Sequence, residues 1–298
     1  MSEPERNHPR VSVLIPAYNR EPYILAAIDS VLSQDYAPLE LIVIDDGSTD
    51  GTYPLLQEQS RLGRIRLLSH PGHANRGQSA SLNLGLRAAT GDYLAILDSD
   101  DLFAPGKLTE QVGFLEKNPG VGMVYGYGHA VDAAGHFLYA LPGAHHEEPG
   151  DPCRLLLDCY MALPGGSLIR RSVLQQVGEF EEGFRAAQDH DMALRIMEKT
   201  RVAYLPSLAF YYRKHGDSIS TRGLERRWQT GMEILRRAAQ RYPYPAFILR
   251  KRKAVLHFRL AQTYWTQALH WRALRNLVLS GLLDPQRALR VLMRREAI

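Results

Sequence analysis

Short, largely apolar runs alternate with amphipathic segments along the first part of the chain. The apolar runs lie at 11–15, 39–44, 64–69, 93–97 and 121–127, and they are typical of strands that are buried on both faces. Segments with helical spacing lie between them at 21–34, 52–59, 78–89 and 107–117. Strands that alternate with helices predict βαβ units and an α/β fold with a mostly parallel, Rossmann-like sheet flanked by helices.

The pattern changes in the second half of the chain. Residues 130–150 are rich in Gly, Pro and His and predict an irregular segment, and within it 145–148 (HHEE) predicts a solvated loop rather than a metal site. Residues 168–177 and 189–199 predict short helices, and 202–212 predicts a strand. From Leu224 onward the spacing is helical, and we expect the three tryptophans, Trp228, Trp265 and Trp271, to lie in the helical core.

The charge of the chain is divided unevenly between these two parts. Residues 221–298 contain 17 Lys and Arg against 4 Asp and Glu, whereas residues 1–220 contain 19 against 28. We therefore expect a disordered tail at 1–10, an α/β domain at 11–220 and a basic helical appendage at 221–298. The basic appendage favours an anionic partner, which could be membrane lipid, nucleic acid or the acidic domain itself.

Composition narrows the class of protein further. A hydrophobic content of 45% and a charged content of 23% are typical of a globular protein with a sizeable core. The apolar runs are too short to span a bilayer, and the amino terminus has no apolar signal segment. The two cysteines, Cys153 and Cys159, lack CxxC spacing, which fits a reducing compartment. We expect a cytoplasmic protein.

An acidic cluster directly follows the apolar run at 93–97. Asp98, Asp100 and Asp101 end that predicted strand, and ligands of open α/β sheets bind beyond the carboxyl ends of strands. An Asp-x-Asp pair offers too few ligands for a protein-only cage, but it suits Mg²⁺ or Mn²⁺ completed by water and a diphosphate. For this stretch alone, an acidic turn that caps the next segment is an equal alternative.

A second acidic pair, Asp45 and Asp46, ends the run at 39–44 and could accept hydrogen bonds from a ribose or a base. An Asx turn leading into Gly47 is the competing interpretation. The turn after the first strand has no glycine, which removes the main support for a dinucleotide-binding dehydrogenase, and a phosphate-binding GxxxxGK[ST] loop is not present.

Two further segments carry candidate chemistry. Asp189 stands at the start of a predicted helix, where it could act as a general base or simply cap the helix. The run 211–220 places Arg213 and His215 after a predicted strand, where they could bind a diphosphate or complete a metal shell; a solvated basic loop is the alternative.

Taken together, these segments resemble the family 2 glycosyltransferases, which have the GT-A fold. The resemblance spans roughly residues 10–220. The motifs occur together and in the order typical of the family, which is more specific than any one motif alone. The matching residues are 13–19 (VLIPAYN), 43–50 (VIDDGSTD), 75–77 (NRG) with Asn83 and Gly85, 91–101 (GDYLAILDSDD) with Pro105, 170–180 (RRSVLQQVGEF), Asp189 with Asp191, 194–195 (LR), and 212–218 (YRKHGDS).

The resemblance implies a site for a nucleotide-diphosphate sugar. Tyr18 and Asp46 would hold the nucleotide base, and Pro16 and Ala17 would line its slot. Asp98 would lie near the ribose or the diphosphate.

The resemblance also implies the reacting groups. Asp100 would bind Mg²⁺ or Mn²⁺, His215 and Arg213 would contact the metal or the diphosphate, and Asp189 would deprotonate the acceptor hydroxyl. Transfer would invert the anomeric centre without a covalent intermediate. One position departs from the family, which usually has Glu before the base, whereas this chain has Gln188.

The resulting hypothesis is a metal-dependent, inverting glycosyltransferase in cell-surface glycan or polysaccharide synthesis. Its partners would be the donor, a glycan or lipid-linked acceptor and, through the basic appendage, the surface of an anionic membrane; nucleic acid is not expected. A nucleotidyltransferase and a non-catalytic sugar-nucleotide binder are the alternatives.

Overall fold

The structure is a computed structural model that describes residues 8–143, 146–214 and 223–292, so residues 1–7 of the predicted tail and His215 lie outside the described part. The chain divides into two compact units. The first comprises Met1–Gly150, Tyr160–Gly183 and Gln188–His215, and the second comprises Asp151–Cys159, Phe184–Ala187 and Gly216–Ile298.

The first unit is built on one sheet, in which the described residues form nine strands with the order β3-β2-β1-β4-β8-β6-β9-β5, and β7 pairs with β6. Four neighbouring strands are parallel, as the βαβ pattern predicts: β3, β2, β1 and β4. The strands are β1 (Val11–Ala17), β2 (Leu39–Asp45), β3 (Arg66–Ser69), β4 (Tyr93–Ile96), β5 (Leu102–Phe103), β6 (Val121–Val131), β7 (Phe137–Leu141), β8 (Ser167–Arg170) and β9 (Arg201–Arg213).

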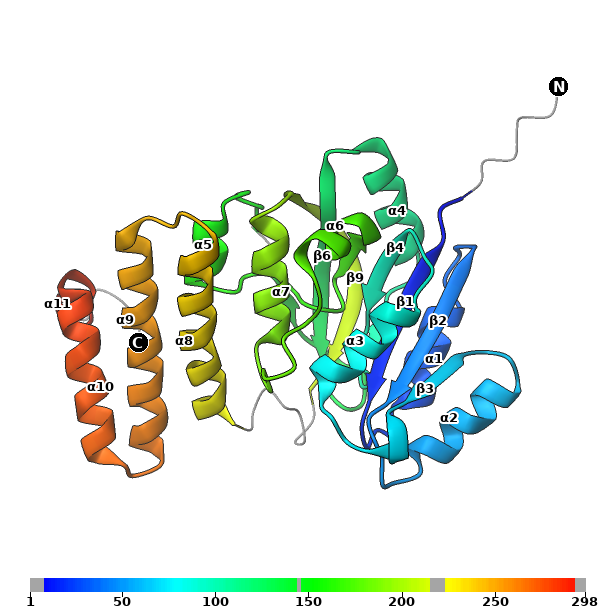
Figure 1. The fold of residues 1–298 in the computed structure, drawn as a ribbon, viewed down its shortest axis with the longest axis horizontal. Helices are drawn as coiled ribbons and strands as arrows, with labels where there is room; N and C mark the ends of the chain where they lie inside the picture. Colours follow the sequence, from blue (N-terminus) through cyan, green and yellow to red (C-terminus); the bar gives the residue numbers. More distant parts are fainter. Residues whose placement is uncertain (1–7, 144–145, 215–222, 293–298) are drawn as a thin grey trace. The chain divides into compact units, whose positions relative to one another are not determined.

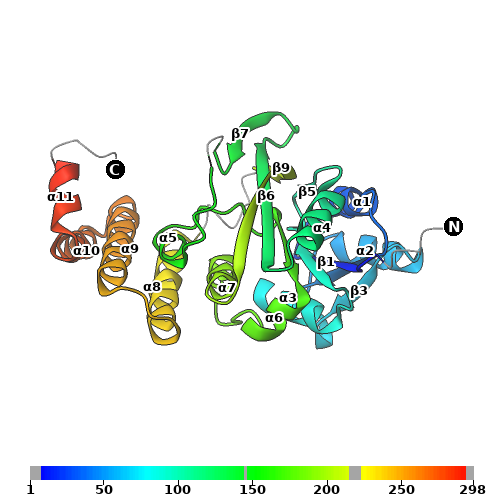
Figure 2. The ribbon, with the colours of Figure 1, turned by 90° about the horizontal axis from the view of Figure 1, so that it is seen from above.

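Helices cover both faces of this sheet, as Figures 1 and 2 show. Seen from above, α1 and α4 lie on one side, and α3, α6 and α7 lie on the other (Figure 2). The helices of this unit are α1 (Ile24–Leu32), α2 (Thr52–Arg61), α3 (Gln78–Ala88), α4 (Lys107–Lys117), α6 (Arg171–Val177) and α7 (Gln188–Met197), with a short 3-10 turn, η1, at Pro71–His73. Alternate β1 residues, such as Val13 and Ile15, pack into a core with Ile28 of α1 and Leu108 of α4.

The structure corrects the prediction of a helix over 168–177. Residues Ser167–Arg170 instead form strand β8, and the helix α6 begins at Arg171. Strand β8 pairs antiparallel with both β4 and β6, so it fills the gap between them in the sheet. The pairing partners are distant in sequence, and this tertiary pairing overrides the local helical spacing.

The segment 130–150 is also more regular than predicted. Strand β6 continues to Val131 and forms a hairpin with β7, and the carboxylate of Asp132 accepts hydrogen bonds from the backbone N–H groups of Ala134 and His136 in the turn. Phe137 and Leu138 are exposed, so β7 lacks the buried apolar run that β1, β2 and β4 show. The two-residue strand β5 was not predicted either.

A lysine is buried inside the first unit, at the start of α4. The Nζ of Lys107 donates to the Oε1 of Gln111 at 2.9 Å and to the carbonyl oxygen of Ser167 at 3.1 Å, and it lies 4.3 Å from the centre of the Phe103 ring. Burial disfavours the ammonium form and lowers the pKa of Lys107 to about 7.

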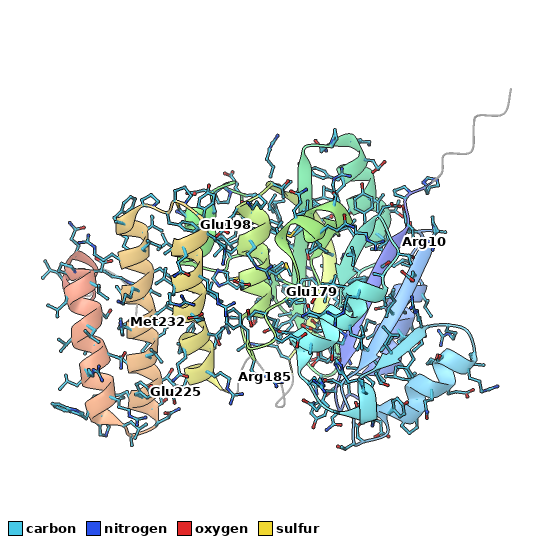
Figure 3. All side chains as sticks on the ribbon, in the orientation of Figure 1. Arg10, Glu179, Arg185, Glu198, Glu225 and Met232 are labelled. Atoms are coloured by element: carbon cyan, nitrogen blue, oxygen red, sulfur yellow. The ribbon has the colours of Figure 1, made fainter. Side chains whose placement is uncertain are left out.

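The second unit is helical, as the spacing from Leu224 predicts. It contains α5 (Pro152–Leu157), α8 (Leu224–Arg241), α9 (Ala246–Thr266), α10 (His270–Leu283) and α11 (Pro285–Leu292). Met232 of α8 packs on a small core of Leu260, Tyr264 and Ala273, and the Tyr264 hydroxyl donates to Glu225 of α8 at 2.9 Å. Figure 3 labels Met232 and Glu225. None of the described helices is long and apolar enough to cross a membrane.

The tryptophans of this unit only partly follow the prediction. Trp228 packs partly buried against the small core and donates to Thr263 at 3.2 Å. Trp265 and Trp271, expected in the core, are instead 63% and 80% exposed. The prediction rests on their position in a helical region, and a helical pattern does not identify the face that a neighbouring helix covers.

The buried amine predicts a pH-dependent stability. Between pH 7 and the usual pKa of lysine, the unfolded state binds a proton at Lys107 that the folded state does not, so stability rises with pH in this window. In urea unfolding, the wild type should gain at most about 1.4 kcal/mol per pH unit relative to Lys107→Met between pH 7 and 9. Lys117→Met, at the exposed end of the same helix, is the control. A pH-independent difference between wild type and Lys107→Met would contradict a depressed pKa.

Candidate active site

The carboxyl ends of β1, β2 and β4 lie at one edge of the sheet because the three strands are parallel and in register. Ala17 pairs with Asp45, and Leu14 pairs with Ile96, one residue before the turn at 97–101. This edge therefore collects the loops that follow the three strands. Pro16 and Ala17 are buried within β1, and Tyr18, directly after the strand, is 43% exposed.

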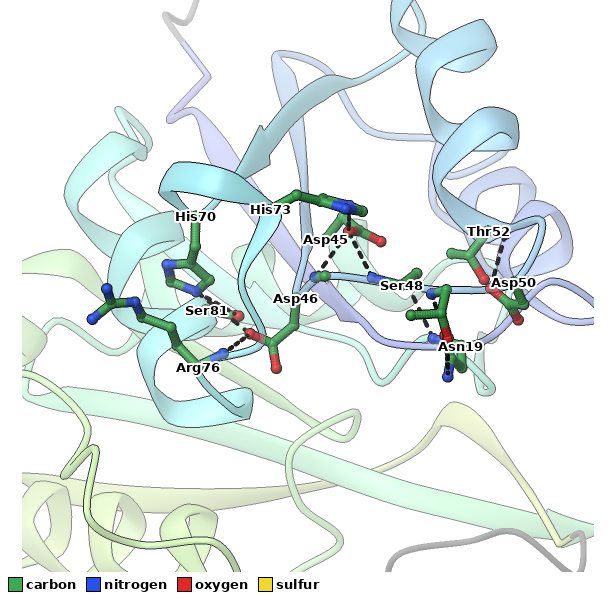
Figure 4. A network of polar contacts seen from close by, with 12 residues as sticks. Asn19, Asp45, Asp46, Ser48, Asp50, Thr52, His70, His73, Arg76 and Ser81 are labelled. Atoms are coloured by element: carbon green, nitrogen blue, oxygen red, sulfur yellow. Dashed lines mark hydrogen bonds and ion pairs between the residues drawn. The ribbon is translucent and has the colours of Figure 1, made fainter.

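The two carboxylates at the end of β2 organise loops of this edge (Figure 4). Asp45 forms an Asx turn, the competing interpretation of its sequence, because its Oδ2 accepts from the N–H groups of Gly47 at 3.0 Å and Ser48 at 3.1 Å. The same oxygen lies 2.7 Å from Nε2 of His73. Gly47 has φ 76°, and a Cβ there would stand 2.6 Å from the His73 carbonyl oxygen, so this close approach requires glycine.

Asp46 fixes the start of helix α3 from the same turn. Its Oδ1 accepts from the N–H of Arg76 at 2.8 Å, its Oδ2 accepts from the N–H of Gly77 at 2.8 Å, and His70 lies 3.6 Å away (Figure 4). A carboxylate is stabilised at a helix start by the N–H groups and by the helix dipole. Asp46 is buried, and its carboxylate therefore holds the loop 70–77 on the end of β2.

Gln78, the first residue of α3, connects this turn to the acidic cluster after β4. Its Nε2 donates to Oδ1 of Asp98 at 2.8 Å, and its Oε1 accepts from Nε2 of Gln188 at 2.8 Å. Burial raises the pKa of Asp98 to about 7, with further contributions from the charges of Asp100 and Asp189. The fold thus brings carboxylates from the β4 loop and from the start of α7 close enough to repel one another.

The neighbouring carboxylates of the cluster have different partners. Nε of Arg20, in the loop after β1, lies 3.1 Å from Oδ2 of Asp100 in a largely buried ion pair. Asp101 is buried and accepts from the backbone N–H of Arg213 at 2.9 Å, so it joins this loop to the end of β9. Burial, and then the charges of Asp98 and Asp100, raise the pKa of Asp101 well above its ordinary value.

The remaining predicted residues lie at the ends of α7 and β9. Asp189 is the second residue of α7, and its Oδ1 accepts from the N–H of His190 at 2.8 Å. The Arg213 guanidinium lies 5.1 Å from the centre of the Tyr23 ring. Arg20 and Gln78 were not predicted as site residues. Both lie next to motif residues, but only the structure shows that their side chains turn toward Asp100 and Asp98.

The segment 146–148 is not the solvated loop that the sequence predicts. Glu148 accepts hydrogen bonds from the hydroxyls of Tyr125 at 2.7 Å and Tyr160 at 2.9 Å, and His146 also bonds to Tyr125. Burial and the bond to Glu148 raise the pKa of the Tyr125 hydroxyl. The segment is therefore anchored on β6 through side chains that periodicity does not detect; His145 lies outside the described residues.

The described residues contain no group of three or more His, Cys, Asp or Glu arranged to hold a metal ion. The turn after β4 nevertheless presents two carboxylates, Asp98 and Asp100, within three residues of the chain. This donor set fits a cation that is bound by one or two carboxylates and completed by water and phosphate oxygens, as is usual for Mg²⁺.

Comparison with known proteins identifies the family of this chain. The model of the family described as "Glycosyl transferase family 2" matches residues 12–178, which is more than half of the chain. The chain belongs to this family. An uncharacterized glycosyltransferase of Haemophilus influenzae is 31% identical over 227 residues, covering 72% of this chain and 68% of the relative. The putative glycosyltransferase EpsE of Bacillus subtilis is 35% identical over 207 residues, covering 64% and 73%.

Some relatives are much longer: the chain spans about a third of the length of an uncharacterized glycosyltransferase of Rickettsia conorii, with 31% identity over 202 residues.

Solved structures show that the present chain has the GT-A fold. TarS 1–349 of S. aureus in complex with UDP-GlcNAc has a TM-score of 0.70 at 18% identity, covering 93% of this chain and 82% of that one. The mannosyltransferase PcManGT of Pyrobaculum calidifontis, in complex with GDP-Man and Mn²⁺, has a TM-score of 0.63 at 24% identity, covering 96% and 81%.

The two backbone bonds to Asp46 predict that this residue is needed for stability. Asp46→Ala removes both acceptors from the N–H groups of Arg76 and Gly77 and should lower the free energy of unfolding by about 1–3 kcal/mol in urea titration. Asp29→Ala, which removes an exposed carboxylate that pairs with Arg64, is the control and should cost less than about 1 kcal/mol. Equal stability of Asp46→Ala and wild type would show that these bonds contribute nothing.

Proposed function

We propose that this family 2 glycosyltransferase moves a sugar from a nucleotide-diphosphate sugar to an acceptor hydroxyl with inversion at the anomeric carbon. The observation that carries this proposal is the convergence of Asp98, Asp100 and Asp189 at one edge of the sheet, where Gln78 bonds both to Asp98 and to Gln188, the neighbour of Asp189. Such a cluster supplies a base beside a site for a cation and a diphosphate. The complexes of TarS with UDP-GlcNAc and of PcManGT with GDP-Man support this class of donor.

The nucleotide is proposed to bind at the ends of β1 and β2. Tyr18 is exposed enough to stack on a base, and Pro16 and Ala17 would form the floor beside it. Asp46 would accept a hydrogen bond from the base with a lone pair that the N–H groups of Arg76 and Gly77 leave open. Asp98 would lie near the ribose or the diphosphate.

Arg213 is proposed to contact the diphosphate, because its guanidinium can form paired hydrogen bonds with phosphate oxygens. Asp100 is proposed to bind Mg²⁺ or Mn²⁺, and His215, outside the described residues, would join it. When bound, the cation would stabilise the charge that develops on the leaving diphosphate. Arg20 holds the Asp100 carboxylate in place at 3.1 Å and offsets part of the charge of the cluster.

Asp189 is proposed as the general base. The acceptor oxygen forms a bond to the anomeric carbon while the bond from that carbon to the diphosphate oxygen breaks. The proton of the acceptor hydroxyl passes to the Asp189 carboxylate, and the electron pair of the broken bond leaves with the nucleoside diphosphate. The N–H of His190 donates to Oδ1 of this carboxylate at 2.8 Å and orients it at the start of α7.

Gln188, which stands where the family usually has glutamate, is connected through hydrogen bonds to the acidic cluster next to Asp189. Its amide donates to Gln78, which in turn donates to Asp98, and its own Oε1 is buried with no hydrogen-bond partner among the described residues. An ionised glutamate at this position could not donate to Gln78 and would add another charge near Asp98. The amide therefore supports the acidic cluster without increasing its negative charge.

The donor and the reaction are tested together by incubating the chain with UDP-, GDP-, dTDP- and CMP-sugars and Mn²⁺, after a thermal-shift screen of the same compounds. Release of the nucleoside diphosphate, or of CMP from the CMP-sugars, supports transfer. Release of pyrophosphate in a parallel reaction that contains a nucleoside triphosphate and a sugar 1-phosphate would indicate a nucleotidyltransferase. Binding of the nucleotide sugar without release of a nucleotide, with glycan acceptors present, would indicate a sugar-nucleotide binder, the second candidate, for which Gln188 is the reason.

The acceptor is proposed to be a glycan or lipid-linked glycan in cell-surface polysaccharide synthesis, with the protein acting in the cytoplasm at the surface of a membrane. The basic charge of residues 221–298 supports a place near anionic lipid.

Replacement of the base gives the sharpest prediction about mechanism. Asp189→Asn cannot take a proton from the acceptor and should lower kcat at least about a hundredfold, while the donor Kd measured by calorimetry stays within about threefold. Asp29→Asn, far from the cluster in sequence and exposed, is the amide control and should retain activity. A large loss of donor affinity in Asp189→Asn would remove its assignment as the base.

Replacement of Asp100 tests the metal site. Asp100→Ala removes a carboxylate ligand and should raise the Mn²⁺ concentration for half-maximal activity at least about tenfold. The measurement is initial rate against Mn²⁺ concentration at saturating donor, with Asp29→Ala as the control. An unchanged Mn²⁺ dependence would show that Asp100 does not bind the cation.

A further inference from the structure

Helix α10 packs against α9 through only one of its faces. Figures 1 and 2 show the two helices side by side, and the contacts identify the buried face. Oδ1 of Asn276 lies 2.8 Å from Nδ1 of His257, the Ser280 hydroxyl donates to the carbonyl oxygen of Ala254 at 2.9 Å, and Ala273 is buried. These residues of α10 are spaced by three and four positions, which places them on one side of the helix.

The opposite side of α10 carries a row of exposed apolar side chains, which we name the outer stripe. It consists of Trp271, Leu274, Val278 and Leu282, whose exposed fractions are 80%, 49%, 54% and 74%. The spacing of three, four and four positions aligns these residues along the helix. Scattered apolar residues on a surface are ordinary, whereas an aligned row that includes a nearly fully exposed tryptophan indicates an interaction surface.

The helices of this part of the chain carry a strong excess of positive charge. Between Ala246 and Leu292 the sequence has nine Lys and Arg and a single acidic residue, Asp284. Arg275 is exposed and lies one helical turn from both Trp271 and Val278, so it flanks the stripe. Arg272 is also exposed, at one side of the same helix. An apolar row flanked by cations is the pattern of a helix that lies in the interface of an anionic membrane.

We propose that the outer stripe of α10 inserts into the surface of a membrane that contains anionic lipid. Tryptophan favours the boundary between headgroups and acyl chains, the aliphatic residues enter the apolar layer, and arginine remains with the phosphates. A second copy of the chain is a less favourable partner for the outer stripe, because a dimer through this face would bring two basic helices together and their charges would repel. This proposal locates the membrane contact on specific residues and is independent of the transfer chemistry.

The test is co-sedimentation of the full chain with vesicles of phosphatidylcholine alone or with about one third phosphatidylglycerol, without donor or metal. The wild type should bind the anionic vesicles at least tenfold more tightly than the neutral ones. Trp271→Ser with Leu282→Ser should lower this affinity at least tenfold, and Arg275→Gln should lower it a fewfold. The tryptophan emission of the wild type should shift to the blue on binding, and Trp271→Phe should lose most of that shift.

The matched control replaces two exposed apolar residues of the first unit, Leu62→Ser with Phe137→Ser, and should bind as the wild type does. Circular dichroism establishes that both double variants are folded. Equal binding of wild type and the stripe variant would overturn the proposal. A dimer of the wild type in light scattering that the stripe variant loses would also overturn it, in favour of a self-association surface. Because no donor is present, a failure here is distinct from a failure of the proposed transferase activity.

Discussion

Repulsion between carboxylates is the constraint on which the site depends. Asp98, Asp100 and Asp189 come from two distant parts of the chain, and the raised pKa of Asp98 shows that burial and the charges of the other two disfavour its ionised form. Arg20 and Gln78 relieve part of this cost, one through an ion pair and the other through a hydrogen bond. The cation and diphosphate proposed for this site would relieve the remaining repulsion, and donor binding would then depend on the charge of the site.

Other polar residues of the same edge hold its loops, and one of them, Asp46, is also proposed to bind the nucleotide base. Asp45 closes its own turn, Asp46 fixes the start of α3, and Asp101 secures the end of β9. Asn83 of α3 also holds a loop, because its side chain donates to the carbonyl oxygen of Phe180 and accepts from the N–H of the same residue. The motif residues thus divide into those that shape the site and those that remain available for chemistry.

The sequence predicts the parts of this structure that depend on local pattern. The parallel strands β1 to β4 and the helices between them follow from apolar runs, and the acidic ends of β2 and β4 follow from strand direction. Strand β8 could not be predicted, because its partners are far away in sequence, and β7 could not, because it is exposed. Arg20 and Gln78 were missed for the same reason, since side-chain direction in a loop or at a helix start has no periodic signal. Trp271 is predicted in a core but is exposed, because a helical pattern does not show which face another helix covers.

The most direct test of the proposed site is anomalous diffraction from crystals grown with Mn²⁺ and the nucleoside diphosphate that most raises the melting temperature. We expect one Mn²⁺ peak beside the Asp100 carboxylate, in contact with the diphosphate oxygens and close to Asp98 and Asp189. A diphosphate bound at this edge of the sheet without a Mn²⁺ peak, or a peak away from the 98–101 turn, would contradict the assignment of these carboxylates.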